Sequence, residues 1–86
     1  MNEDCKKVLN YLGQERDEFG SGYIPLDIIS EKVKIPIDKL YDFDNFQEGI
    51  LNNLENEGYV IVNRNGRDDS SAVATEEGLQ KYWRFW

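Results

Sequence analysis

The stretch that decides the fold is residues 46–78, FQEGILNNLENEGYVIVNRNGRDDSSAVATEEG. Its first part has one apolar helix face, and Gly58 ends the pattern. That face consists of Phe46, Ile50, Leu51 and Leu54. Residues 59–62, YVIV, are typical of a strand, residues 63–71 of a polar loop, and residues 72–74, AVA, of a return strand. A last helix is expected over Glu76–Phe85, so the stretch predicts a helix, a hairpin and a second helix.

Two more helices are predicted ahead of this stretch. An apolar stripe at helical spacing predicts the first, from Glu3 to Glu18, with Cys5, Val8, Leu9 and Leu12 as its members. Residues 20–22, GSG, break the chain, and Pro25 limits residues 23–25 to a short extended piece. The second helix is expected over Leu26–Lys34, with an apolar side made of Ile28, Ile29 and Val33.

Residues 35–42, IPIDKLYD, separate the second helix from the one that contains Leu51. Asp38 is a candidate cap for a short helical turn there, with Leu40 and Tyr41 packing inward. Asp44 followed by Gln47 fits a capping box, which satisfies two free backbone N–H groups at a helix start. We therefore expect either an extra helical turn or an unusually long third helix.

The composition predicts one domain over residues 1–86, because a chain of this length has no room for a second core. No segment approaches the roughly 18 consecutive apolar residues of a membrane span. The start, MNED, lacks the basic and apolar regions of a signal peptide, and a single Cys5 forms no internal disulfide. These features predict a cytoplasmic protein that makes no membrane contact.

Enzyme chemistry finds little support in the residue types. The chain has no His, which removes the usual base near neutral pH and the commonest metal ligand. Cys5 lies in a helix stripe without a His partner, and residues 20–22 lack the Lys and the spacing of a phosphate-binding loop. We predict a protein that is not an enzyme and has no catalytic residue, no metal site and no cofactor.

The element order resembles that of winged helix-turn-helix domains. The resemblance rests on Gly58 after the third helix, on the alternating hairpin strands, and on residues 75–79, TEEGL, which are similar to a Leu-Thr-Glu-x-Gly stretch of several bacterial and archaeal regulators. It implies an α+β fold with a three-helix core, a β-hairpin wing and a C-terminal helix. It also implies a binding module, whose usual role is to regulate transcription by binding DNA.

Charge argues against DNA as the partner. The chain has 17 acidic and 10 basic residues, a net charge of −7, and its third helix region, residues 43–62, contains no Lys or Arg. Phosphate contacts and the commonest base contacts need these cations. The favoured hypothesis is therefore a module that acts through protein contacts in transcription regulation or a regulatory complex. Its candidate contact residues are Glu48 and Asn52 on the third helix and Trp83, Phe85 and Trp86 at the C-terminal end.

The alternative hypothesis is a DNA-binding transcriptional regulator that acts as a dimer. Dimerisation would gather the scattered cations into one basic track. The candidate DNA contacts are Arg64 and Arg67 in the wing, Asn45 and Gln47 near the third helix, and Lys32, Lys34 and Lys39 before it. Each of these residues also fits a solvated surface position.

The C-terminal aromatic cluster has two interpretations. Leu79, Tyr82, Trp83 and Trp86 share helical spacing and fit packing against the first helix, whereas Phe85 points elsewhere. The alternative is a protein-binding or homodimer surface, because Trp and Tyr dominate binding hot spots.

Overall fold

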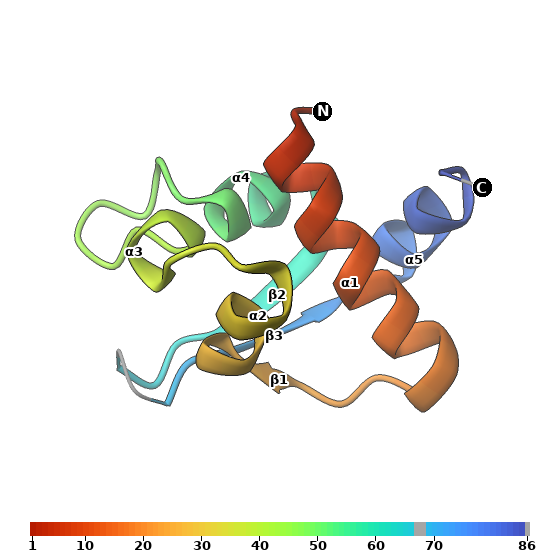
Figure 1. Ribbon diagram of the computed structural model, residues 1–86, viewed down its shortest axis with the longest axis horizontal. Helices are drawn as coiled ribbons and strands as arrows, with labels where there is room; N and C mark the ends of the chain where they lie inside the picture. Colours follow the sequence, from red (N-terminus) through yellow and green to blue (C-terminus); the bar gives the residue numbers. More distant parts are fainter. Residues whose placement is uncertain (67–68, 86) are drawn as a thin grey trace.

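The computed structural model describes residues 1–66 and 69–85, and within them the chain forms five helices and one three-stranded antiparallel sheet, an α+β fold. The elements in chain order are α1 (Glu3–Phe19), β1 (Ile24–Pro25), α2 (Leu26–Val33), α3 (Ile37–Leu40), α4 (Ile50–Asn56), β2 (Val60–Asn63), β3 (Ser71–Ala74) and α5 (Glu76–Trp83). α1 crosses in front of the sheet, α5 lies beside α1, and α3 lies at the opposite end of the molecule (Figure 1).

The predicted first helix is confirmed and ends one residue later than expected. Asn2 caps it, because its Oδ1 accepts the backbone N–H of Cys5 at 2.8 Å. Glu3 and Asp4 lie in the first turn, where negative charge stabilises the free N–H groups. Gly20 ends the helix with a φ of 94°, a conformation that favours glycine.

The sheet has the order β1-β3-β2, so β3 is its central strand. The predicted hairpin is confirmed, with Ile61 paired to Val73 and Val62 paired to Ala72. Burial alternates along β2, since Val60 and Val62 are buried and Ile61 is exposed. β1 is limited to two residues and pairs Ile24 with Ala72, as the position of Pro25 predicts.

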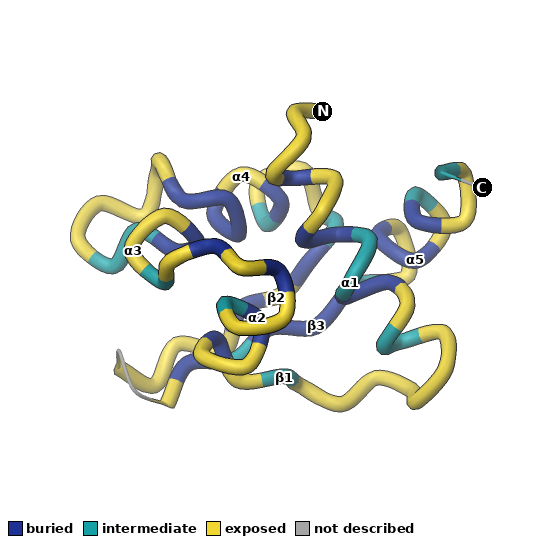
Figure 2. The backbone as a smooth tube through the Cα atoms, in the orientation of Figure 1, coloured by how far each residue is buried: buried dark blue, intermediate teal, exposed yellow. Residues whose placement is uncertain are grey.

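The core lies between the inner face of the sheet and the helices that cover it. The α1 stripe packs there with residues of α2, α3, α4 and both hairpin strands. Figure 2 shows the buried residues along β2 and β3 and on the sides of the helices that face them. The apolar side predicted for α2 is partly wrong: Ile29 and Val33 are buried, but Ile28 is 40% exposed.

The region between α2 and α4 corrects one prediction and confirms another. The extra helical turn exists as α3, and Leu40 and Tyr41 are buried as expected. Pro36, not Asp38, occupies the cap position of α3. α4 begins at Ile50 and not near Phe46, whose φ of 57° is incompatible with a right-handed helix.

Candidate interaction site

The loop between α3 and α4 is built around one carboxylate. Asp42 accepts the backbone N–H groups of four residues at 3.0–3.3 Å: Asp44, Asn45, Gln47 and Glu48. These hydrogen bonds, led by that of Asn45, lower the pKa of Asp42 below its usual value. The capping box predicted from Asp44 and Gln47 is therefore wrong, because both N–H groups are donated to Asp42. Residues 43–49 therefore form a loop, where the Asp44–Gln47 pattern predicts the start of a helix.

The buried side chain of Asn52 holds this loop in place. It is 1% exposed, and its Oδ1 accepts the backbone N–H of Asp42 at 2.7 Å. Gly49 permits the contact, because a Cβ there would lie 2.5 Å from the backbone nitrogen of Asp42. Placing Asn52 on an interaction surface was wrong: the side chain is interior, and its role is to hold Asp42. Glu48 is exposed, as that prediction requires.

Arg64 folds back onto the same loop. Its Nε donates to the hydroxyl of Tyr41, and its Nη2 lies 2.5 Å from Oε1 of Glu55. The guanidinium carbon also lies 5.2 Å from the ring centre of Phe46 and 5.7 Å from that of Tyr41, within the range of cation–π attraction. The hydrogen bond to Tyr41, followed by the charge of Glu55, raises the pKa of Arg64. We call Arg64, Tyr41, Phe46 and Glu55 the arginine clamp.

The other candidate DNA contacts that the structure describes do not form one site with Arg64. Asn45 and Gln47 are exposed, but their backbone N–H groups belong to the Asp42 loop. Lys32 and Lys34 are exposed at the end of α2. Lys39 lines a shallow hollow with four carboxylate residues, Asp4, Asp38, Asp42 and Glu48. Arg67 lies outside the described residues.

At the aromatic C-terminal end, the buried and exposed side chains differ from the prediction. Leu79 and Tyr82 pack inward as expected, but Trp83 is 49% exposed. Phe85, predicted to point elsewhere, packs against the core with Nζ of Lys6 5.2 Å from its ring centre. Trp86 lies outside the described residues. Of the two C-terminal candidates that the structure describes, Trp83 therefore offers the exposed ring.

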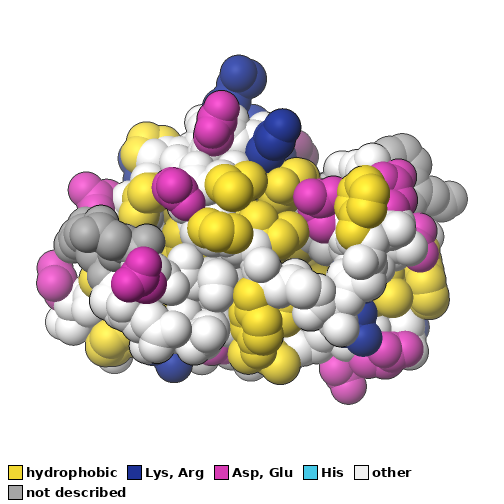
Figure 3. Space-filling view, turned by 90° about the horizontal axis from the view of Figure 1, so that it is seen from below, with side chains coloured by type: hydrophobic (Ala, Val, Ile, Leu, Met, Phe, Trp, Pro, Cys, Tyr) yellow, Lys and Arg dark blue, Asp and Glu magenta, His cyan; other side chains and the backbone are white. Residues whose placement is uncertain are grey.

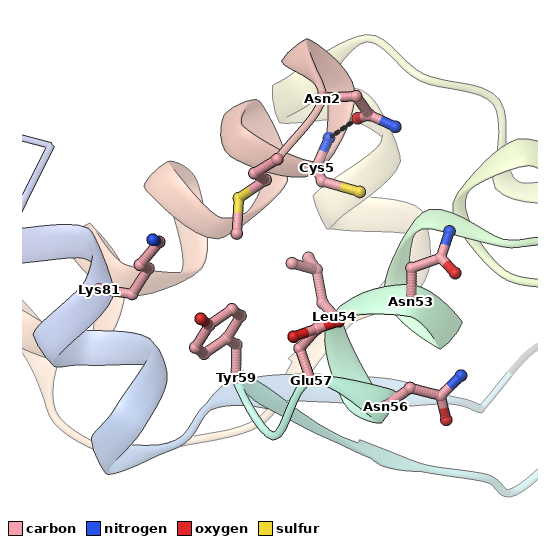
Figure 4. A pocket seen from close by; sticks show the side chains of 9 residues that line it. Asn2, Cys5, Asn53, Leu54, Asn56, Glu57, Tyr59 and Lys81 are labelled. Carbon is pink, nitrogen blue, oxygen red and sulfur yellow. Dashed lines mark hydrogen bonds between the residues drawn. The ribbon is translucent and has the colours of Figure 1, made fainter.

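One further feature was not predicted from the sequence, a hollow of about 480 Å³ between α1, α4 and α5. Figure 4 shows Asn2 and Cys5 on one side and the residues of α4 and its C-terminal end on the other, with Tyr59 and Lys81 towards α5. Its lining also includes Leu54, Asn53, Asn56 and Glu57. No local motif could predict the hollow, because its residues come from separate elements.

The described residues offer few reactive groups. Burial, with the charge of Asp4 as a smaller cause, raises the pKa of the Cys5 thiol and so disfavours the reactive thiolate. No group of three or more Cys, Asp or Glu side chains in the described part of the chain is placed to hold a metal ion.

None of the helices in residues 1–66 and 69–85 combines the length and the apolar character of a membrane-spanning segment.

Exposed hydrophobic side chains and charges are unevenly spread. On the underside of the molecule, hydrophobic side chains gather near the middle of the face, with both acidic and basic side chains around them (Figure 3). The large exposed hydrophobic residues outside the aromatic end include Phe19, Tyr23, Ile28 and Ile61. Exposed apolar patches on a folded protein often mark surfaces that bind other molecules.

Comparison of the chain with family models, with curated proteins and with solved structures finds no match.

Proposed function

We propose that this chain is a small winged-helix module without enzymatic activity that acts through protein contacts in a cytoplasmic regulatory complex, such as one that controls transcription. The order of α1, β1, α2, α4, β2, β3 and α5 supports a winged-helix fold in which β2 and β3 form the wing. α3 and the Asp42 loop are then an insertion ahead of α4, the helix that would enter a DNA groove in a DNA-binding relative.

The observation that carries the proposal is the arginine clamp. Arg64 is the described cation nearest to α4 along the chain, and it is held by Glu55 and Tyr41. A guanidinium that contacts a phosphate would have to leave both partners and the ring of Phe46. α4 itself contains no Lys or Arg, and Glu48, Glu55 and Glu57 lie in or beside it. The surface around α4 therefore opposes a polyanion and suits a neutral or cationic protein surface.

The test is DNA binding measured by fluorescence anisotropy with a labelled random-sequence duplex. At about 150 mM salt we expect no binding tighter than about 10 µM, since non-specific binding needs phosphate neutralisation by clustered cations. Submicromolar binding that weakens as salt is raised would refute the proposal and favour the dimeric DNA-binding regulator.

Two variants make the test specific to the clamp. Glu55→Gln removes the carboxylate that holds Arg64 while keeping the size of the side chain. Arg64→Ala removes the cation itself. The proposal expects neither variant to change the anisotropy of the labelled duplex. If the wild type binds DNA and Arg64→Ala weakens that binding at least tenfold, the clamp opens on DNA and the argument from it is wrong.

A further inference from the structure

The loop between β2 and β3 contains the dipeptide Asn65-Gly66. Asn is a chemically labile residue type, and Asn65 is the one Asn of the chain that is followed by glycine. Both residues are exposed, and no described atom lies within 4 Å of the position that a Cβ on Gly66 would occupy. Gly66 has a φ of 85°, a conformation that glycine adopts without strain. The backbone that follows Asn65 is therefore uncrowded.

We propose that Asn65 is a site of non-enzymatic deamidation, which converts its side-chain amide to a carboxylate. The backbone nitrogen of Gly66 gives its proton to hydroxide and attacks Cγ of Asn65. The new N–Cγ bond closes a five-membered succinimide ring, the Cγ–Nδ2 bond breaks, and Nδ2 takes a proton from solvent and leaves as ammonia. Water then opens the ring at either carbonyl, which leaves an aspartate or an isoaspartate at position 65. The net reaction consumes one water for each ammonia released, and nothing is oxidised or reduced.

The fold protects two other exposed Asn residues through the backbone nitrogen that follows each of them. After Asn45, the N–H of Phe46 donates to the carbonyl oxygen of Asp42 at 3.1 Å. After Asn56, the N–H of Glu57 donates to a carbonyl oxygen of α4, also at 3.1 Å. Attack by either nitrogen would first have to break this hydrogen bond, which adds to the barrier.

The nitrogen of Gly66 is not held in this way. Within residues 1–66 and 69–85, its N–H donates to no acceptor. The hydrogen bond that Gly66 does make is on its carbonyl side, where Oγ of Ser70 donates to its carbonyl oxygen at 2.5 Å. That bond holds the peptide group after Gly66, whereas the attacking nitrogen belongs to the peptide group before it. The structure therefore leaves the reacting pair of Asn65 and Gly66 able to meet.

Deamidation adds one negative charge next to Arg64 in the chain. Arg64 is the cation of the arginine clamp, with Nη2 2.5 Å from Oε1 of Glu55. Another carboxylate beside it lowers the positive potential of the β2–β3 loop, in a chain whose net charge is already −7. In the isoaspartate product the main chain also passes through Cβ of residue 65, so the loop is one atom longer. The loop therefore becomes more acidic as the protein ages.

The experiment is incubation of the full chain at mildly alkaline pH, followed over time by mass spectrometry. Cleavage after lysine yields residues 40–81, a peptide that contains Asn45, Asn56 and Asn65 together. Fragmentation of this peptide then compares the three positions in one molecule. We expect the mass gain of an amide-to-carboxylate change at position 65, at a rate at least about tenfold above that at Asn45 or Asn56.

Two variants test whether the reaction belongs to this position. Asn65→Gln should abolish the fast mass gain, because the longer side chain would have to close a six-membered ring. Asn53→Gln is the matched control, since Asn53 is also exposed but lies within α4, and it should leave the mass gain unchanged. Both variants keep the amide group and the net charge of the chain.

A second arm repeats the incubation in guanidinium chloride, which unfolds the chain. Because the loop is open, the native rate at position 65 should lie within about tenfold of the rate in the unfolded chain. The proposal is overturned if the margin over Asn45 and Asn56 is absent, if Asn65→Gln keeps the mass gain, or if the native rate falls further below the unfolded rate. None of these outcomes involves DNA or a partner, so this proposal and the proposed function can fail separately.

Discussion

The packing of α5 against α1 predicts that Gly13→Ala destabilises the protein, although the same change in an exposed helix is stabilising. Gly13 lies within α1, where Ala is favoured over Gly by about 1 kcal/mol in helix propensity. A Cβ at this position would lie 2.5 Å from Cγ of Tyr82 and 3.0 Å from its Cδ1. Ordinary carbon–carbon contacts lie at about 3.5–4.0 Å, so the two helices would have to separate.

The magnitude follows from two opposing effects. Overpacking of a well-packed site costs about 1–3 kcal/mol, and the gain in propensity offsets about 1 kcal/mol of it. The nearest atom is Cβ of Tyr82, which is closer still, and its position is fixed by the backbone of α5, so rotation of the Tyr82 ring cannot relieve the contact. We expect a net loss of up to about 2 kcal/mol, and each 1 kcal/mol lowers the melting temperature of a domain of this size by about 4–8 °C.

The assay is thermal and urea unfolding followed by circular dichroism. Gln14→Ala is the control, since Gln14 is the next residue of α1 and is exposed. It should change the free energy of unfolding by less than about 0.5 kcal/mol. If Gly13→Ala stabilises the protein, α5 does not approach α1 as closely as the structure describes, and the reasoning fails.

Two further predictions concern the Asp42 loop. Asn52→Ala should lower the free energy of unfolding by about 1–3 kcal/mol, because it leaves the N–H of Asp42 without its acceptor. Asn53→Ala, at the exposed neighbouring position, is the control and should change the free energy of unfolding little. Equal losses in the two variants would count against the anchoring role of Asn52. The pKa of Asp42 is lowered on folding, so its stabilisation is present above the unfolded value of about 3.9 and is lost as the pH falls through the lower folded value. Wild type should therefore lose stability more steeply than Asp42→Asn in urea unfolding below about pH 4, and parallel curves for the two proteins would contradict this assignment.

Local patterns in the sequence were enough to predict α1 and the hairpin. The helical spacing of Cys5, Val8, Leu9 and Leu12 requires one face to be buried, whatever covers it. The strands needed no more than β-branched residues between turn-forming segments. The observed bounds differ from the predicted ones by a residue at each end of β2 and by a residue at the start of β3. These elements were predictable because each depends on residues close together in the chain.

The start of α4 was predicted wrongly because two local patterns competed. Phe46 extends the apolar helix face, and Asp44 with Gln47 fits a capping box. A single carboxylate, that of Asp42, instead accepts four backbone N–H groups and bends the chain at Phe46. The buried Asn52 supports this alternative from ten residues away, a contact that no periodicity records.

The sequence by itself determined the order of the elements, the acidic charge and the absence of cations from α4. The tertiary structure alone decided which side chains are free to act. In the folded chain the side chain of Trp83 is exposed, that of Phe85 packs against the core, and Arg64 is hydrogen-bonded to Tyr41 and Glu55. The periodicity of the sequence determines which residues share one face of a helix or strand. Whether a side chain on that face is buried or paired depends on the element that packs against it, and that element lies far away in the chain.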